Sequence, residues 1–261
     1  MKFTLASLLL TPTLTTAKGF LRGVTLHKFI SDQKVTLKVY SESGCPNCQS
    51  LLSGDLKTVF DADGVVDILD FDFISFGNAY YLQSECPGYP DYDRTDGVSC
   101  YQKKCSDVSN APDECFTGTI ACQHGDAECA GNILQNCVKS LYPDISTYMA
   151  FNFCYEANYS AEGGEKCAGS VDGIQWDAVS ACISDTDKVD GLMVTAAKDT
   201  VAQLIPGTPT VLLNGEQSSS DDLLKAICDA YTGEKPAGCA GKTELVGCIL
   251  GGCSCDFYIF L

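Results

Sequence analysis

The sequence predicts an α/β fold whose sheet is interrupted by a disulfide-rich, mostly helical insertion. Residues 35–40 alternate between apolar and polar side chains, a helical-period run follows from residue 46, and a second strand-like run covers residues 65–73. A strand, a helix and a strand in this order begin a βαβ unit with parallel strands. Residues 84–184 then lose strand periodicity and contain ten cysteines, and a strand pattern returns only at residue 210.

The motif that carries chemistry, Cys45-Pro46-Asn47-Cys48, lies between the first strand and a helix expected at residues 46–60. Thiol–disulfide exchange needs one thiolate that attacks and a second thiol that resolves the mixed disulfide. The unpaired N–H groups and the dipole of a helix start favour the thiolate. We therefore expect Cys45 to be exposed, to have a lowered pKa and to attack. Cys48 falls on the apolar face of the helix, where we expect it to resolve the intermediate.

Two other interpretations of this cysteine pair are open. A zinc site would need a second pair of ligands, and Cys253-Ser254-Cys255 has the wrong spacing for one. In a cysteine-rich chain the two cysteines could also be bonded to partners elsewhere in a structural framework. The strand–helix context favours the redox interpretation, and we expect no metal and no cofactor.

The sheet is expected to resume after the insertion. Within the insertion, helical periodicity predicts helices at residues 126–142 and 172–183, and a further helix follows at residues 188–204. Residues 210–213 have a strand pattern, and Asn214-Gly215 is typical of a two-residue hairpin turn. A last helix is predicted at residues 221–231, capped by Ser219 or Ser220.

Pro209 directly precedes this resumed strand. In a chain with a Cys-x-x-Cys motif after its first strand, such a proline is a candidate for a cis peptide bond that places backbone beside the thiols. Thr208 and Pro209 are therefore expected to bind substrate. The alternative is an ordinary loop proline.

The amino terminus and the cysteine content indicate the secretory pathway. Met1-Lys2, an apolar run and a small-residue stretch that ends at Ala17 are typical of a signal peptide, expected at residues 1–17. Seventeen cysteines imply an oxidising route and mostly disulfides, and at least one of the fifteen outside the redox pair is left over. Asn158-Tyr159-Ser160 is an N-glycosylation sequon, so Asn158 is expected to be glycosylated.

The formal net charge of −17 restricts the partners. Nucleic acids and anionic membrane surfaces are polyanions, so we expect neither. The carboxyl-terminal segment is too short, and interrupted by Asp256, to span a membrane. In an acidic compartment many carboxylates lie closer to their pKa values, which relaxes the repulsion within so acidic a chain.

Three stretches of the sequence resemble the gamma-interferon-inducible lysosomal thiol reductase family. They are residues 39–49 around the redox motif, Phe76-Gly77-Asn78-Ala79, and the long pattern Cys122-Gln123-His124-Gly125, Glu128-Cys129, Asn132 and Cys137. The resemblance covers residues 35–231. A pattern as long as the third one rarely arises by chance.

The resemblance implies a thioredoxin-like sheet with a helical insertion, and a soluble enzyme that reduces protein disulfides at acidic pH. It also implies that Cys45 is the nucleophile, Cys48 the resolving thiol and Pro209 a cis proline. The expected thioredoxin-like domain is discontinuous, at residues 32–83 and 185–235. The insertion takes residues 84–184 and a cysteine-containing tail takes residues 236–261. Expected partners are disulfide-bonded proteins and a small-thiol reductant, in a lysosome or endocytic vacuole or outside the cell.

Two questions stay open in the sequence. His124 is either a proton donor or pH sensor, or part of a hydrogen-bonded turn that braces the insertion; we favour the turn because its neighbours Cys122 and Cys129 look structural. The leading function is a disulfide reductase. The alternatives are a disulfide oxidase or isomerase, because redox poise depends on how the fold stabilises the reduced pair, and a non-catalytic, disulfide-stapled binding protein.

Overall fold

A computed structural model describes residues 33–88, 96–219 and 221–240. The expected signal peptide and most of the expected tail, with Cys248, Cys253 and Cys255, lie outside these residues. None of the helices in the described ranges is long and apolar enough to cross a membrane.

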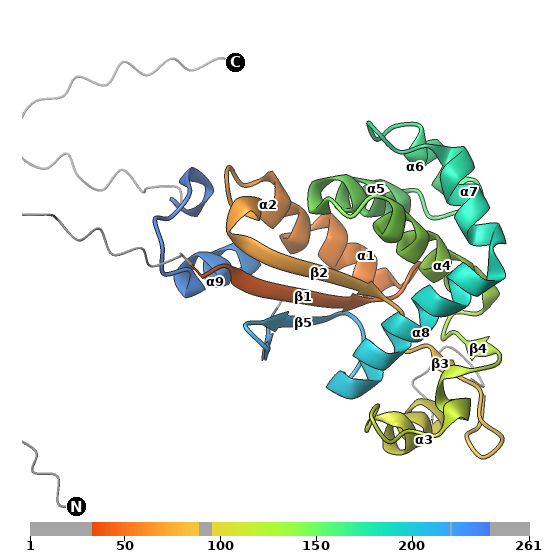
Figure 1. Cartoon of the computed structure of the whole chain (residues 1–261). Helices are drawn as coiled ribbons and strands as arrows, with labels where there is room; N and C mark the ends of the chain where they lie inside the picture. Colours follow the sequence, from red (N-terminus) through yellow and green to blue (C-terminus); the bar gives the residue numbers. More distant parts are fainter. Residues whose placement is uncertain (1–32, 89–95, 220, 241–261) are drawn as a thin grey trace, which may run out of the picture. The chain divides into compact units, whose positions relative to one another are not determined.

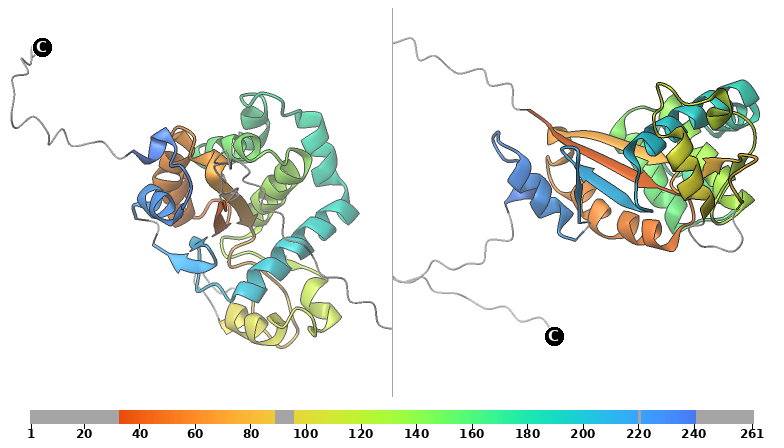
Figure 2. Two further views of the ribbon diagram at one scale, coloured as in Figure 1. Left: turned by 60° about the vertical axis from the view of Figure 1, so that its left-hand side comes forward. Right: turned by 90° about the horizontal axis from the view of Figure 1, so that it is seen from below.

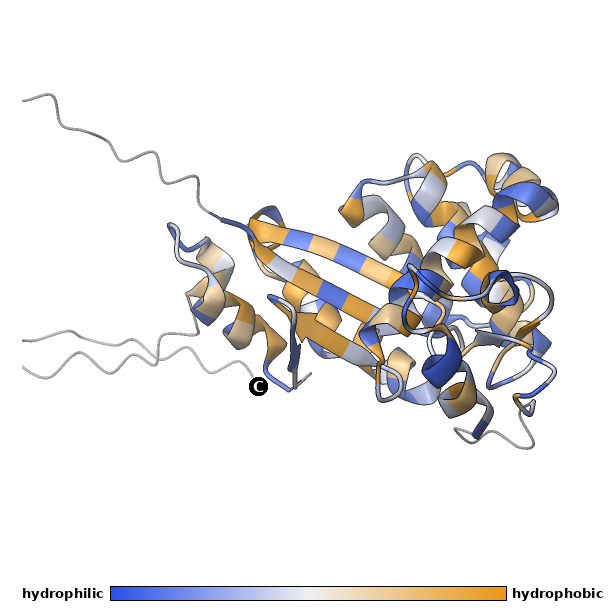
Figure 3. Cartoon of the chain, turned by 60° about the horizontal axis from the view of Figure 1, so that its bottom comes forward, coloured by the Kyte–Doolittle hydropathy of each residue, from blue (hydrophilic) through white to orange (hydrophobic). Residues whose placement is uncertain are grey.

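The centre of the fold is a four-stranded sheet in the order β2-β1-β5-β6 (Figure 1). Its strands are β1 (Val35–Ser41), β2 (Leu69–Ser75), β5 (Thr210–Leu213) and β6 (Glu216–Ser218). β1 pairs in parallel with β2 and antiparallel with β5, and β5 pairs antiparallel with β6. Polar and apolar residues alternate along β1 and β2, as period-2 strands require (Figure 3). A βαβ unit that continues into an antiparallel hairpin in this order is the thioredoxin-like sheet.

The first crossover differs from the single helix predicted at residues 46–60. It consists of α1 (Pro46–Ser53) and α2 (Asp55–Asp61), separated at Gly54. Gly54 N–H still donates to the Ser50 carbonyl, and a Cβ at Gly54 would lie 2.9 Å from that oxygen, so the chain turns where no side chain obstructs it. The second predicted strand is shorter than expected, because a 3₁₀ turn, η1 (Val66–Ile68), precedes β2.

The insertion is mostly helical, as predicted. Its elements are α3 (Asp96–Cys105), η2 (Asp113–Phe116), α4 (Asp126–Leu141), α5 (Ile145–Ala157), α6 (Gly163–Ala168) and α7 (Trp176–Ser184). Sequence periodicity did not find α5, which is apolar on most sides because it packs against α1, α4 and α6 at once. A two-stranded sheet of β3 (Tyr80–Tyr81) and β4 (Ile120–Ala121) was also missed, since two residues show no periodicity.

After the insertion the chain returns to the sheet through α8 (Thr186–Gln203). The Thr208–Pro209 peptide bond is cis, which confirms that expectation, and Asn214 and Gly215 both have positive φ in the hairpin turn. The last elements are α9 (Leu223–Ala230) and η3 (Ala237–Cys239). The predicted cap of α9 is wrong: Asp222 stands at the N-cap, while Ser219 Oγ accepts from Asp221 N–H and Ser220 is outside the described residues.

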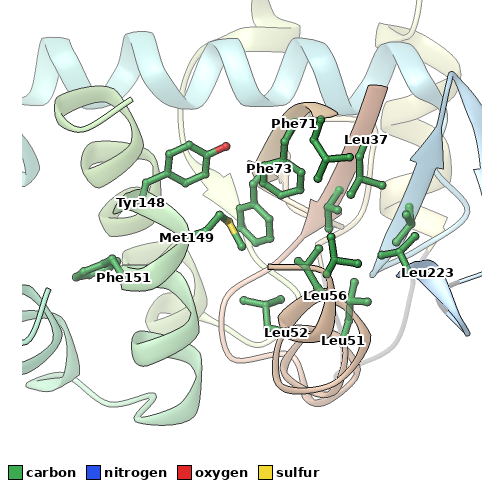
Figure 4. Packing of buried hydrophobic residues seen from close by; sticks show 14 of the residues in the cluster. Leu37, Leu51, Leu52, Leu56, Phe71, Phe73, Tyr148, Met149, Phe151 and Leu223 are labelled. Carbon is green, nitrogen blue, oxygen red and sulfur yellow. The ribbon is translucent and has the colours of Figure 1, made fainter. Parts of the chain in front are cut away.

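Two apolar clusters lie on opposite faces of the sheet. The first packs Leu37, Phe71 and Phe73 against α1, α2, α5 and α9 (Figure 4). The second packs Tyr40 and Ile74 against α8 and the β3–β4 pair. α1 and α2 therefore cover one face and α8 the other (Figure 2).

Disulfides hold the insertion, as the cysteine count predicted. The bonds within the insertion are Cys86–Cys100, Cys105–Cys115, Cys122–Cys129, Cys137–Cys182 and Cys154–Cys167, and outside it Cys228–Cys239 joins α9 to η3. The ten cysteines of the insertion pair among themselves. Among the described residues, Cys45 and Cys48 are the free cysteines.

Candidate active site

Cys45 and Cys48 occupy the first turn of α1. Cys45 is the N-cap residue and Pro46 the first helical residue, as the sequence predicted. Cys48 is fully buried, and Cys45 is only 6% exposed although Pro46 and Asn47 beside it are exposed. The expectation of an exposed Cys45 is therefore wrong. Glu42 and His124, the latter from the insertion, each have a side-chain atom within 4.8 Å of the Cys45 sulfur.

The surroundings of the two thiols separate their pKa values. The Cys48 thiol donates a hydrogen bond to Cys45, and this bond, helped by backbone N–H groups of the first turn and by His124, lowers the pKa of Cys45 to about 5. Burial, with the adjoining Cys45 charge, raises the pKa of Cys48. The lowered pKa of Cys45 was expected, but its largest cause is the neighbouring thiol rather than the helix start alone.

A buried carboxyl group, Glu42, lies between β1 and the redox motif. Glu42 is 1% exposed, and its Oε2 accepts a hydrogen bond from Asn78 N–H at 2.8 Å. Burial, together with the nearby Glu128 carboxyl, raises the pKa of Glu42 to about 8. Glu42 belongs to the family-like stretch at residues 39–49, but nothing in the sequence showed that its side chain is buried beside Cys45.

His124 and Glu128 bring the insertion to the same place. Glu128 Oε2 accepts from His124 N–H at 2.7 Å and lies 2.7 Å from His124 Nδ1, while Glu42 Oε1 lies 3.5 Å from the same nitrogen. Burial raises the pKa of Glu128 to about 7. The predicted bracing turn is present, but His124 also stands beside Cys45, which the sequence interpretation had given less weight.

The turn around Gly77 and Asn78 joins these groups to the cis-proline loop. Asn78 Nδ2 donates to Gln123 Oε1 at 2.7 Å and to Thr208 Oγ1 at 3.2 Å. Gly77 has a φ of +60°, and a Cβ there would lie 2.5 Å from Glu42 Oε2 and 2.9 Å from Thr208 Cγ2. Only glycine lets the backbone at this position come so close to the Glu42 and Thr208 side chains. The turn thus links Thr208 to Glu42, which lies three residues before Cys45.

On another side, α4 and α5 hold the loop that leads into Cys45. Asn132 Oδ1 accepts from Ser43 N–H at 2.9 Å. Glu156 accepts from Ser43 Oγ, Gly44 N–H, Gln49 Nε2 and Gln135 Nε2, at 2.9, 3.0, 3.4 and 2.8 Å. We call Asn132, Gln135 and Glu156 the loop bracket. Asn132 belongs to the long family-like pattern, whereas no local signal marked Glu156.

Glu42, Cys45 and His124 also offer a carboxylate oxygen, a sulfur and a ring nitrogen within 4.8 Å of one another. Such donors suit zinc. His124 Nδ1, however, is already held by Glu128 Oε2 at 2.7 Å, so an ion at this nitrogen would have to replace that contact.

The predicted glycosylation site lies at the end of α5. Asn158 is exposed at the C-cap of α5, and its Nδ2 donates to the Cys154 carbonyl at 2.8 Å. The next residue, Tyr159, places its ring against Gly44. Glycosylation of Asn158 stays a prediction.

A thioredoxin-like sheet with Cys45 and Cys48 free at the start of the helix after its first strand defines a thiol–disulfide oxidoreductase. The sequence model of the family described as gamma interferon inducible lysosomal thiol reductase (GILT) matches residues 36–100 and 104–171. This chain belongs to that family.

Curated relatives agree over most of the chain. The gamma-interferon-inducible lysosomal thiol reductase of Carassius auratus is 28% identical over 216 residues, which are 78% of this chain and 72% of the relative. The gamma-interferon-responsive lysosomal thiol protein of Arabidopsis thaliana is 29% identical over 208 residues, 77% of this chain and 72% of the relative.

Two solved structures were also found. The thiol-disulfide exchange protein alpha-DsbA2 of Wolbachia pipientis is 13% identical with a TM-score of 0.44, over 76% of this chain and 83% of that one. Oxidised BdbD of Bacillus subtilis is 13% identical with a TM-score of 0.47, over 76% of this chain and 87% of that one.

Proposed function

We propose that this chain reduces protein disulfides through Cys45 and Cys48 and works at acidic pH. The observation that carries the proposal is the separation of the two thiols: Cys45 has a pKa lowered to about 5, while burial keeps Cys48 protonated. An ordinary thiol with a pKa of about 8.5 is almost wholly protonated in an acidic compartment and does not attack disulfides there. Cys45 keeps a large thiolate fraction under the same conditions.

The reaction proceeds in two exchanges. The Cys45 thiolate attacks one substrate sulfur, a Cys45–sulfur bond forms, and the substrate disulfide breaks with its electron pair on the second sulfur, which takes a proton. Cys48 then loses its proton and attacks Cys45 Sγ, so the first substrate sulfur leaves and is protonated. The enzyme pair is oxidised to a disulfide and the substrate is reduced to two thiols. A small thiol returns the enzyme to its dithiol form.

Thr208 and Pro209 are proposed to bind the substrate chain beside Cys45. Asn78 ties Thr208 to the turn that also holds Glu42, so the loop before β5 has a fixed position relative to the redox motif. Backbone groups of such a loop can pair with an extended peptide.

The proposed compartment is acidic and lies on the secretory or endocytic route, such as a lysosome or endocytic vacuole, with secretion as the alternative. Six disulfides among the described residues need an oxidising route, and the relatives named above are called lysosomal. Residues 1–17 are proposed as the signal peptide and Asn158 as a glycosylation site.

One observation favours a second function, a disulfide oxidase or isomerase. Lowering the pKa of Cys45 stabilises the reduced pair, and a stabilised reduced pair makes a more oxidising couple. The test measures the reduction potential of the Cys45–Cys48 pair together with insulin reduction at about pH 5 in the presence of a small thiol. A reductase reduces insulin under these conditions. Oxidation of reduced substrates, with no insulin reduction, would establish the second function instead.

A further inference from the structure

Three ionisable groups beside Cys45 have no task in the two exchanges described above. We call Glu42, His124 and Glu128 the acid cluster. Donor atoms of Glu42 and His124 lie within 4.8 Å of each other and of Cys45 Sγ, and Glu128 holds His124 Nδ1 at 2.7 Å. The three residues come from the end of β1, from the loop before α4 and from α4 itself. The fold thus assembles them from separate segments beside the attacking sulfur.

The reaction needs a proton at this place. When Cys45 attacks, the substrate sulfur that leaves carries the electron pair of the broken bond. An alkyl thiolate is a strong base, with a thiol pKa of about 8.5, and its charge is costly next to buried groups. In an in-line displacement the leaving sulfur lies about 4 Å from Cys45 Sγ, two disulfide bond lengths away. Groups flanking Cys45 at the distances given above can reach it.

We propose that Glu42 and His124 together act as one acid. This pair donates one proton to the sulfur that leaves when Cys45 attacks a disulfide, and Glu128 positions the His124 ring for the transfer. The inference rests on the proposed reductase function and deepens it. The donor loses one proton, the leaving thiolate becomes a thiol, and the donor regains a proton from water. Reduction of one disulfide therefore consumes one proton from solvent when Cys45 begins as the thiolate, because the second proton comes from Cys48.

The environment of the cluster keeps the proton available. The pKa values of Glu42 and Glu128, raised to about 8 and about 7 mainly by burial, leave both groups largely protonated at acidic pH. Among the described residues, no lysine or arginine forms an ion pair with either carboxyl, so none fixes them in the ionised form, and the basic side chain beside both is His124. The His124 side chain is 23% exposed, so solvent reaches the cluster from this side.

Other titratable groups surround the acid cluster, but none of them can take its place as the proton donor. They are Cys45 and Cys48 of α1, Glu156 of α5 and Tyr159 after α5. Burial raises the pKa of Glu156, but four donors occupy its two oxygens on the other side of the loop. Tyr159, whose pKa is also raised by burial, is too weak an acid to protonate a thiolate leaving group quickly.

The test compares two small disulfides that differ in their leaving group. An alkyl disulfide, bis(2-hydroxyethyl) disulfide, needs a proton on its leaving sulfur, whereas an aromatic disulfide with an acidic thiol, 5,5′-dithiobis(2-nitrobenzoate), does not. We expect Glu42→Gln and His124→Gln to slow single-turnover reduction of the alkyl disulfide by about 100-fold and that of the aromatic disulfide by less than about 3-fold. Glu128→Gln should give the same selectivity with a smaller loss. Glu165→Gln, an exposed control, should change neither rate.

Equal losses on both disulfides would overturn the proposal, because they would mean that the cluster only supports the fold or the Cys45 thiolate. A second measurement needs no variant. In the unchanged protein, the ratio of alkyl to aromatic rates cancels the Cys45 thiolate fraction, and it should fall at least about 10-fold between about pH 5 and about pH 9 as the Glu42 and Glu128 carboxyls lose their protons. A constant ratio would overturn the proposal as well. If the unchanged protein reduced neither disulfide, the reductase function itself would fail.

Discussion

Two sets of buried carboxyl groups lie on different sides of the redox loop, and they are satisfied differently. Glu156 of the loop bracket accepts four hydrogen bonds, from Ser43, Gly44, Gln49 and Gln135. In the acid cluster, Glu42 accepts from Asn78 N–H through Oε2, and its Oε1 is buried without a hydrogen-bond partner in the described part of the chain. A carboxylate with four donors is a fixed structural acceptor, whereas a carboxyl short of donors is easier to protonate.

Under the proposed function the two sets have different tasks beside Cys45, and the insertion contributes residues to both. The bracket holds the backbone that leads into Cys45, so the thiol has a defined position. The cluster leaves proton-exchanging groups beside the same sulfur. The number of hydrogen bonds that a buried carboxyl group accepts, rather than its burial alone, distinguishes a carboxyl that holds the backbone in place from one that can give up a proton.

The largest expected effect concerns the thiols that both sets surround. Cys45→Ser should lower disulfide reduction at least about 10³-fold and form no adduct, because the attacking sulfur is gone. Cys48→Ser should also stop turnover but accumulate mixed disulfides with substrate proteins, since attack occurs and release does not. Non-reducing gels with and without dithiothreitol distinguish the two. Adducts on Cys45→Ser alone would reverse the assigned roles, and activity in both variants would place the redox site elsewhere.

The second prediction concerns pH and the acid cluster. Folding raises the pKa values of Glu42 and Glu128 from 4.5 to about 8 and about 7, so the folded protein binds these protons more tightly than the unfolded chain. This contribution to stability is fully present below about pH 4.5 and is lost as the pH rises through 7 to 8. The two residues are 1% and 0% exposed, so the loss is on the order of several kcal/mol.

Urea unfolding at about pH 5 and about pH 8 measures this loss. The Cys45→Ser Cys48→Ser variant serves as the background, because it removes thiol exchange while burial, the main cause of the raised pKa values, remains. Adding Glu42→Gln and Glu128→Gln should flatten the pH dependence. An equal loss of stability with and without these two changes would show that other groups cause it.

The third prediction contrasts one residue from each set at about pH 5. Glu156→Gln places an amide NH₂ where one carboxylate oxygen accepts two hydrogen bonds, so it should lower the free energy of unfolding by about 1–3 kcal/mol. Glu42→Gln replaces a protonated carboxyl with a group of the same shape, and its amide oxygen can still accept from Asn78, so it should change stability by less than about 1 kcal/mol. Denaturant unfolding compares them. If both variants lowered the free energy of unfolding equally, the loop bracket and the acid cluster would not differ in how their carboxyl groups are satisfied.

The sequence predicted the parts of this site that depend on local pattern. β1, the start of α1 with Cys45 at its cap, the cis Thr208–Pro209 bond and the hairpin after β5 all agree with the structure. Alternation, helix capping and turn chemistry are properties of a few neighbouring residues, so a single sequence reveals them.

Tertiary features of the site could not be predicted in the same way. Gly44 and Glu156, 112 residues apart, meet only because α5 packs on α1, and the helix that carries Glu156 has too little polar character to show periodicity. Cys45 is buried in the folded chain, with His124 of the insertion beside its sulfur, so its exposure could not be inferred from the motif. The long family-like pattern marked His124 but did not show which group it faces.

The smallest expected effect concerns how closely α4 approaches the redox loop. A Cβ added at Gly131 would lie 2.2 Å from Ser43 Oγ and 2.6 Å from Ser43 Cβ, so Gly131→Ala should displace Ser43 and break its bond to Glu156. We expect a net loss of about 1–2 kcal/mol, because about 1 kcal/mol of helix propensity offsets part of the strain. Gly191→Ala in α8 is the matched control, since no atom lies within 4 Å of its added Cβ. It should stabilise the protein by up to about 1 kcal/mol.

The same pair of variants tests whether the two sets are independent. Gly131→Ala disturbs Ser43 and the loop bracket, so it should lower stability and slow both small disulfides to a similar extent. It should leave the pH dependence of their rate ratio unchanged, because Glu42, His124 and Glu128 keep their contacts with one another. A changed ratio would mean that the loop bracket also tunes proton transfer, and the division of labour between the two sets would then be wrong.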